Sequence, residues 1–319
     1  MTTKWWTGDK EALYENIEIP EPFGPVEVVV DDDKVKTYAF AQDYYRPWLL
    51  EDESSPFGRR VAHPLILAND LLFLFYSKYD GNTAQGLHTE EQLWFYNPIF
   101  VGERVTVKGE YVEKYERRGK GYVVMEAEAR GEDGRLLVRH RGVEIMRIAA
   151  GSVVGRGTAG TPERKVTGEY REDVAPVQRA RVGLEPRTAI TPHKKRVTQE
   201  QMFVFSWGGR HFKNIHTDLK AAHASGLEAT VAQAQQQVGF LTEMLTDFFG
   251  ASWFTSGWEK LKFVRPVYAG ETVTARGAIV GESRTDDEVR LELEVWVENE
   301  AGEMTAVGWA SASVDEEKV

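Results

Sequence analysis

Two stretches of this chain match each other without a gap, and their spacing restricts the possible folds more than any other feature of the sequence. Residues 93–109 read LWFYNPIFVGERVTVKG, and residues 261–277 read LKFVRPVYAGETVTARG. Eight of the seventeen aligned positions are identical at a constant offset of 168. An internal repeat of this kind predicts that the 319 residues form two related units with the same structure.

The two units show the same order of predicted elements. In the first, a long apolar segment, 65–76, follows His63-Pro64 and predicts a buried helix, because proline is tolerated in the first helical turn. In the second, apolar residues recur at helical spacing over 231–248, and Gly250 is placed to end that helix. Alternating segments then predict strands, at 105–113, 122–130 and 135–146 and again at 271–281, 288–297 and 304–313.

One buried helix followed by a long antiparallel meander predicts a sheet wrapped around a helix. Because the pattern occurs twice, we expect an α+β double hotdog fold. The expected units are an N-terminal hotdog repeat at 1–150 and a C-terminal hotdog repeat at 193–319. Residues 151–192 are rich in Gly, Pro and Arg without periodicity, which predicts a linker along the outside of the sheet.

Composition excludes several classes of function. The formal net charge of −11 argues against nucleic acid or an anionic membrane surface as a partner. The chain has no cysteine, which excludes disulfides, thiolate catalysis and cysteine-ligated zinc. The N-terminal residues do not resemble a signal peptide, and the strongest apolar run, 71–76, is too short to span a bilayer. We therefore expect a cytoplasmic protein.

The stretch 207–227 is the strongest candidate for a functional site. It reads WGGRHFKNIHTDLKAAHASGL and holds three of the seven histidines, at positions 211, 216 and 223. A polar turn leads into an alanine-rich helix that Gly226 ends. Turns of this kind allow side chains and backbone groups to face a cavity, so they often carry chemistry.

The sequence resembles the MaoC-like acyl dehydratases, the (R)-specific enoyl-thioester hydratase branch of the hotdog superfamily, in its fused double-hotdog form. The resemblance rests on F-x-x-P-x-x-x-G-E-x-V in each half, at 95–105 and 263–273, and on N-I-H-T-D at 214–218. It implies a hydro-lyase that adds or removes water across the α,β-carbons of an acyl thioester carried on coenzyme A or acyl carrier protein. It also implies no metal and no redox cofactor, and we expect the chain to assemble further as a homodimer.

In that family an Asp and a His five residues apart hold the reacting water. His216 matches the family histidine, and His211 stands where the family has its Asp. In the first half the equivalent positions, 168 residues earlier, are Asp43 and Trp48. Neither half therefore has the complete pair, and the second half is expected to carry the active site because it alone keeps the histidine.

The resemblance implies roles for individual residues. His216 is expected to act as general acid and base, because an imidazole titrates near neutral pH. His211 is either its working partner or a position that has lost its function. Asn214 either orients His216 or the thioester, or serves only as a turn residue. Asp218 either orients His216 or favours the start of the following helix through its charge.

At the start of the long helix of the second half, the family has a His-Gly pair, and this chain has Gln233-Ala234. Both residues are expected to bind substrate, with the backbone N–H of Ala234 as oxyanion donor. A metal site built from His211, His216 and Asp218 is not expected, because their spacing is a weak ligand pattern. Two alternatives stay open: a hydro-lyase or isomerase for a non-thioester intermediate, and a non-catalytic acyl-binding partner subunit.

Overall fold

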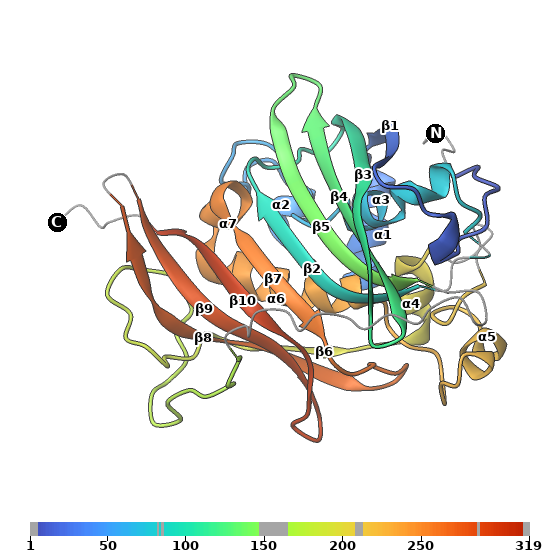
Figure 1. Cartoon of the computed structure of the whole chain (residues 1–319). Coiled ribbons are helices and arrows are strands. Elements are labelled where there is room, and N and C mark those ends of the chain that lie inside the picture. The colour runs from blue at the N-terminus through green and yellow to red at the C-terminus, as the bar shows by residue number, and fades with distance from the viewer. Residues whose placement is uncertain are drawn as a thin grey trace.

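Ten strands form one antiparallel sheet that passes through both halves of the molecule (Figure 1). The computed structural model describes residues 6–81, 83, 86–146, 165–207, 213–285 and 288–314. The strands are β1 (Glu21–Val29), β2 (Leu87–Phe95), β3 (Arg104–Arg117), β4 (Lys120–Gly131), β5 (Leu136–Met146), β6 (His193–Arg196), β7 (Trp258–Phe263), β8 (Thr272–Arg284), β9 (Val289–Asn299) and β10 (Met304–Val314).

The strand order repeats the symmetry of the sequence. It runs β1-β3-β4-β5-β2-β7-β10-β9-β8-β6, so each half has the same order from the outer edge to the centre. The halves join where β2 pairs with β7, and Gln92 lies opposite Lys260, its own equivalent at the offset of 168. Strand β10 also begins and ends 168 residues after β5 does. The predicted double hotdog is therefore confirmed, and its strands lie where the repeat places them.

The second half contains the long central helix that the sequence predicts. Helix α6 spans Ala234–Phe249, and Gly250 ends it with a positive φ of 65°. Its start lies three residues later than predicted. Val231 forms a β-bridge with Tyr268, and the N-cap Gln233 has a non-helical ψ of 142°, so the helix cannot begin before Ala234.

The matching helix of the first half is broken, contrary to the prediction of one helix over 65–76. It consists of a turn, helix α3 (Ala68–Leu72) and the 3₁₀ segment η2 (Phe73–Ser77). The 3₁₀ segment carries bulky aromatic residues, which lose side-chain freedom in an α-helix. Buried polar contacts also restrain this stretch, because Asp70 pairs with Lys34 (2.7 Å) and the Asn69 amide donates to the carbonyl of Phe205 (2.5 Å).

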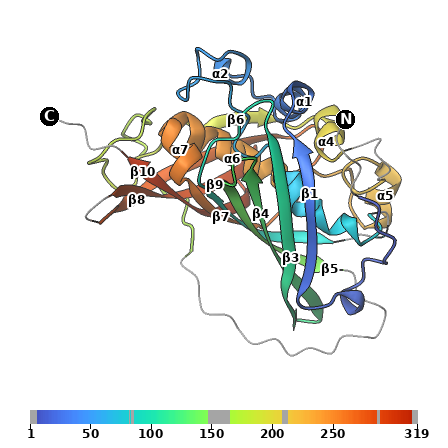
Figure 2. The ribbon, with the colours of Figure 1, turned by 90° about the horizontal axis from the view of Figure 1, so that it is seen from above.

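Shorter helices pack around this core (Figure 2). They are η1 (Tyr14–Asn16), α1 (Asp32–Gln42), α2 (Pro47–Leu50), α4 (Gln199–Phe205), α5 (Leu219–Ala224) and α7 (Ala251–Ser256). Helix α4 begins with a capping box in which Thr198 and Gln201 bond to each other's backbone N–H groups. Within the described ranges, no helix is both long enough and apolar enough to cross a membrane.

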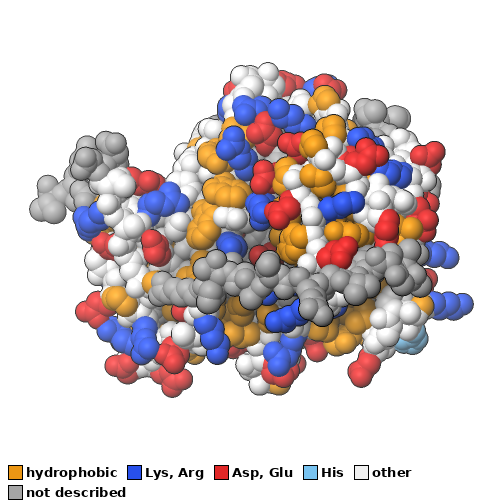
Figure 3. All heavy atoms as spheres, viewed as in Figure 1, with side chains coloured by type: hydrophobic (Ala, Val, Ile, Leu, Met, Phe, Trp, Pro, Cys, Tyr) orange, Lys and Arg blue, Asp and Glu red, His pale blue; other side chains and the backbone are white. Residues whose placement is uncertain are grey.

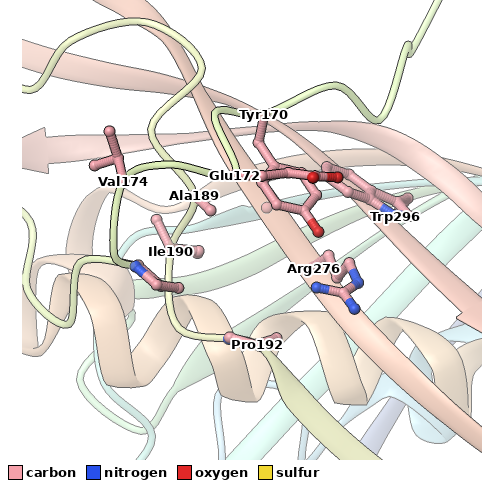
Figure 4. A pocket seen from close by; sticks show the side chains of 10 residues that line it. Tyr170, Glu172, Val174, Ala189, Ile190, Pro192, Arg276 and Trp296 are labelled. Atoms are coloured by element: carbon pink, nitrogen blue, oxygen red, sulfur yellow. The ribbon is translucent and has the colours of Figure 1, made fainter.

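Residues 167–170 of the predicted linker lie on the outer face of the second-half sheet, and residues 187–190 bond to the backbone of β8. The carboxylate of Glu294 on β9 accepts hydrogen bonds from the backbone N–H groups of Thr167 (2.8 Å) and Gly168 (3.0 Å). Tyr170 stacks on Trp296, and Arg276 lies beside both, around a small pocket of about 310 Å³ (Figure 4). Residues 151–164 of the linker lie outside the described ranges. Acidic and basic side chains alternate over the face shown in Figure 3.

Candidate active site

The turn before α5 is held by short-range hydrogen bonds. The side-chain oxygen of Asn214 accepts the backbone N–H of His216 (2.9 Å), and its carbonyl accepts the N–H groups of Thr217 (3.1 Å) and Asp218 (3.0 Å). This is the turn chemistry for which asparagine is well suited. Asn214 therefore positions the backbone of His216, whatever further contact its amide makes with a substrate.

His216 is half-buried and held in one tautomer. Its Nδ1 lies 2.8 Å from the carbonyl oxygen of Val231, and because a carbonyl can only accept, Nδ1 carries the proton. Nε2 is then the unprotonated nitrogen, and no residue in the described part of the chain hydrogen-bonds to it. Burial lowers the pKa of His216 to about 4, against a smaller raising effect of the bond to Val231. The ring is therefore neutral at pH 7 and ready to act as a base.

Hydrogen bonds of Gln199 join the same turn to the start of α4. The side-chain amide of Gln199 donates to the carbonyl of His216 (3.0 Å), and its oxygen accepts the hydroxyl of Thr230. Sequence reasoning identified neither Gln199 nor Val231 as part of the site. The capping box at Thr198 was a detectable signal for a helix start beside the turn. No pattern marks a backbone carbonyl as the partner of a histidine.

Gln233 and Ala234 lie at the N-terminus of α6, as the resemblance implies. Gln233 is the N-cap residue and is buried, and its carbonyl accepts the N–H of Gln236 (3.0 Å). Ala234 is the first helical residue, so its N–H has no acceptor within the helix and sits at the positive end of the helix dipole. Because Val231 lies three residues before Ala234, its bond to His216 brings the imidazole to this end of α6.

Asp218 is the N-cap of α5. Its carboxylate accepts the backbone N–H of Ala221 (2.9 Å), which matches the second of the two roles weighed for it. The orienting contact on His216 comes instead from Val231. His223 lies on the surface, where its ring contacts the carbonyl of Glu228 (3.1 Å). His211 lies outside the described residues, so its role as a partner of His216 stays a prediction.

Aromatic contacts join the end of α4 to the first half. The ring of Trp207, which follows α4, lies 5.4 Å from that of Phe73 on η2 and 5.5 Å from that of Trp6. Trp207 has a positive φ of 56°, an unfavourable conformation for a bulky residue. Trp207 therefore packs against η2 of the other half. In the described ranges, no group of three or more His, Asp or Glu side chains is arranged to hold a metal ion.

The equivalent turn of the first half has no such chemistry. Trp48 stands 168 positions before His216, at the start of α2, and its ring packs against Tyr44 (6.0 Å) and Phe254 (5.4 Å). Asp43, the equivalent of His211, is exposed and adopts a positive φ of 49° at the end of α1. The two halves share a scaffold, but only the second places an imidazole on the turn.

The family described as MaoC like domain matches residues 182–301. The sequence has no match among curated proteins.

Solved structures resemble the chain over nearly its full length. One is a MaoC-like dehydratase, with 15% identity over 94% of this chain and 98% of that chain and a TM-score of 0.69. Another is a Mycobacterium tuberculosis protein described as having a double hotdog fold, with 13% identity, 94% and 97% coverage and a TM-score of 0.63. The chain also covers 48% of the peroxisomal multifunctional enzyme type 2 of Drosophila melanogaster, with 92% of this chain aligned, 17% identity and a TM-score of 0.62.

At these identities the likeness to solved structures establishes the fold, and the family match covers the half that carries His216. The protein therefore has a double hotdog fold, and residues 182–301 in its second half match the family described as MaoC like domain.

Proposed function

We propose that the protein is a hydro-lyase that adds water to, or removes it from, the α,β-carbons of an acyl thioester. The MaoC-like domain supports a hydratase or dehydratase role. The observation that carries the proposal is the geometry of His216, whose ring is oriented through Nδ1 and lies at the end of α6 where Ala234 offers a backbone N–H.

The hydration step uses both groups. Nε2 of His216 takes a proton from water as the water oxygen forms a bond to the β-carbon. The π electrons move to the thioester carbonyl, and the N–H of Ala234 stabilises the oxygen as it becomes negative. The α-carbon then takes a proton, which His216 can return, so that one water is added and no charge remains. Dehydration follows the same path in reverse.

The proposal names no metal or redox cofactor, because proton transfer and oxyanion stabilisation are sufficient for this reaction. The acyl group would be presented on coenzyme A or acyl carrier protein. Whether His211 supplies the second proton-transfer group is part of the proposal and is tested separately below.

The test is loss of the conjugated thioester absorbance when purified protein is mixed with short, medium, branched and aromatic enoyl thioesters on both carriers. His216→Ala should abolish most of the turnover, and His223→Ala should not. His223 is a matched control, because it lies in the same segment and is exposed. Absence of turnover with every substrate would overturn the proposal in favour of a non-catalytic acyl-binding subunit.

A further inference from the structure

A second cleft lies at the opposite end of α6 from His216. It has a volume of about 600 Å³, within the range of small-molecule sites. Residues from both halves line it, from 46–56, 177–193 and 244–254. Asp247, which lies in the cleft, follows Ala234 by 13 residues, or about 20 Å along a helix axis. The cleft is therefore separate from the proposed active site.

The carboxylate of Asp247 lies in the cleft and already has several hydrogen-bond partners. Asp247 accepts hydrogen bonds from the hydroxyl of Tyr44 (2.8 Å) and Nε of Arg46 (3.2 Å), and Nε2 of His193 lies 3.2 Å from it. Burial alone would raise the pKa of Asp247, but these partners lower it, so the carboxylate stays ionised. Its charge is matched by Arg46, and it has little capacity to repel or attract a ligand.

The cleft holds a second cation besides Arg46, which pairs with Asp247. Arg179 also lines the cleft, is exposed, and donates one N–H to the backbone carbonyl of Asp247 (3.3 Å). Among the described residues that line the cleft, Asp247 is the only acid. Two guanidinium groups face one carboxylate here, although the chain as a whole carries a net charge of −11. This local excess of positive charge favours the binding of an anionic group.

The walls are aromatic and apolar. Trp48 is half-buried and meets Phe254 edge to face, with ring centroids 5.4 Å apart, and Met244 and Phe248 continue the apolar surface. Trp48 is the residue that replaces the histidine of the second half. The turn that lost its imidazole thus offers a flat ring beside two arginines.

We propose that this cleft binds an organic carboxylate with a planar or apolar body. The carboxylate would pair with Arg179 and with the N–H groups of Arg46 that Asp247 does not use, because guanidinium forks match carboxylate geometry. The body would pack against the sides of Trp48 and Phe254 that line the cleft. The cleft would then be a ligand site that residues of both halves build together.

The probes are benzoate and hexanoate, with benzamide as the uncharged analogue of benzoate, and binding is measured by titration calorimetry. We expect saturable binding of both carboxylates and at least tenfold weaker binding of benzamide. Arg179→Gln should weaken benzoate about 3- to 10-fold, allowing for solvent screening of an exposed cation. Arg181→Gln is the matched control, because Arg181 is exposed two residues away and does not line the cleft.

Two further variants separate this site from the other. His216→Ala should leave benzoate affinity unchanged while turnover of enoyl thioesters is lost. Trp48→Ala should weaken both carboxylates, and a thermal unfolding curve matching the parent's would show that the fold is intact. The proposal is overturned if benzamide binds as tightly as benzoate, if Arg179→Gln and Arg181→Gln bind alike, or if His216→Ala abolishes binding.

Discussion

His216 and Trp48 occupy equivalent turns of one repeated scaffold, and their surroundings differ in a way that explains their different chemistry. The His216 ring donates to the carbonyl of Val231 and lies at the start of α6. The Trp48 ring lies in an aromatic cluster with Tyr44 and Phe254. The scaffold therefore fixes where a residue stands, and the neighbouring backbone and side-chain groups decide whether that residue can transfer protons.

The central helices of the two halves also differ. In the second half, α6 is continuous over 16 residues and presents its N-terminus beside His216. In the first half, the equivalent stretch is divided into α3 and η2, whose aromatic side chains fill the interior. A continuous helix offers a defined set of unpaired N–H groups at its start, which is what an oxyanion site requires.

Two buried glutamates show how far equivalent positions can diverge. Glu91 on β2 and Glu259 on β7 are 168 residues apart and both fully buried. Burial alone would raise the pKa of Glu91, but His140 (3.0 Å) and His88 (2.9 Å) hold it at about 2. Burial raises the pKa of Glu259 to about 8, because the hydroxyl of Thr242 (2.6 Å) offsets only part of the desolvation.

The largest expected effect separates the two turns. His216→Ala should lower the rate of thioester hydration by about 10²–10⁴, the usual contribution of a positioned acid or base. Trp48→Ala should leave the rate largely intact, because its turn carries no proton-transfer group. The measurement is steady-state hydration with both variants checked for folding. Loss of activity in Trp48→Ala with His216→Ala unaffected would invert the assignment.

His211 tests whether the second half uses a pair of imidazoles. If it is the partner of His216, His211→Ala should slow turnover by about two orders of magnitude. His211→Asp restores the family residue and should retain activity while extending it to lower pH, because a carboxylate stays unprotonated to lower pH than an imidazole does. The pH–rate profiles of both variants give the answer. Turnover by His211→Ala at the parent's rate would show that His211 is a bystander.

The glutamates predict opposite responses of stability to pH. Glu259 has a folded-state pKa of about 8, above its ordinary 4.5, so the native state binds an extra proton between these values and stability falls as pH rises through that window. The slope should be at most about 1.4 kcal/mol per pH unit. Urea unfolding between pH 5 and 8 should show that Glu259→Gln removes this decline.

Glu91 has a depressed folded-state pKa, so its contribution is present above about pH 4.5 and is lost as pH falls towards 2. Glu91→Gln should therefore be less stable than the parent at neutral pH, because His88 and His140 lose their charged partner. If Glu259→Gln keeps the parent's slope while Glu91→Gln removes it, the two environments have been assigned the wrong way round.

The smallest expected effect concerns two aspartates, one in each half, that cap the start of a helix. Asp218 caps α5, and Asp31 caps α1 through the N–H of Lys34 (2.9 Å). Replacing either by Ala should lower the free energy of unfolding by about 1 kcal/mol. Neither change should alter the rate of a folded enzyme by more than a few-fold. A loss of turnover specific to Asp218→Ala would instead give Asp218 the orienting role that the contact with Val231 now accounts for.

The repeat was the most informative part of the sequence. Its offset of 168 predicted the strands β3, β4, β5, β8, β9 and β10 within a few residues, because alternation of side chains and turn glycines are local properties. The break between α3 and η2 was not predictable from the apolar run of 65–76. An all-apolar segment has no periodic signal that reports its geometry, and buried contacts such as Asp70 with Lys34 decided it.

For the site, the sequence by itself determined which turn carries the histidine and which has lost it, since residue identities at the repeat offset are a property of the chain alone. Only the tertiary structure decided that His216 is oriented by the carbonyl of Val231, which is 15 residues away. It also brought Arg46, His193 and Asp247 together in one cleft. Contacts between distant segments depend on how the sheet and α6 pack, and a backbone carbonyl is present at every residue, so no sequence pattern can single out the one that is used.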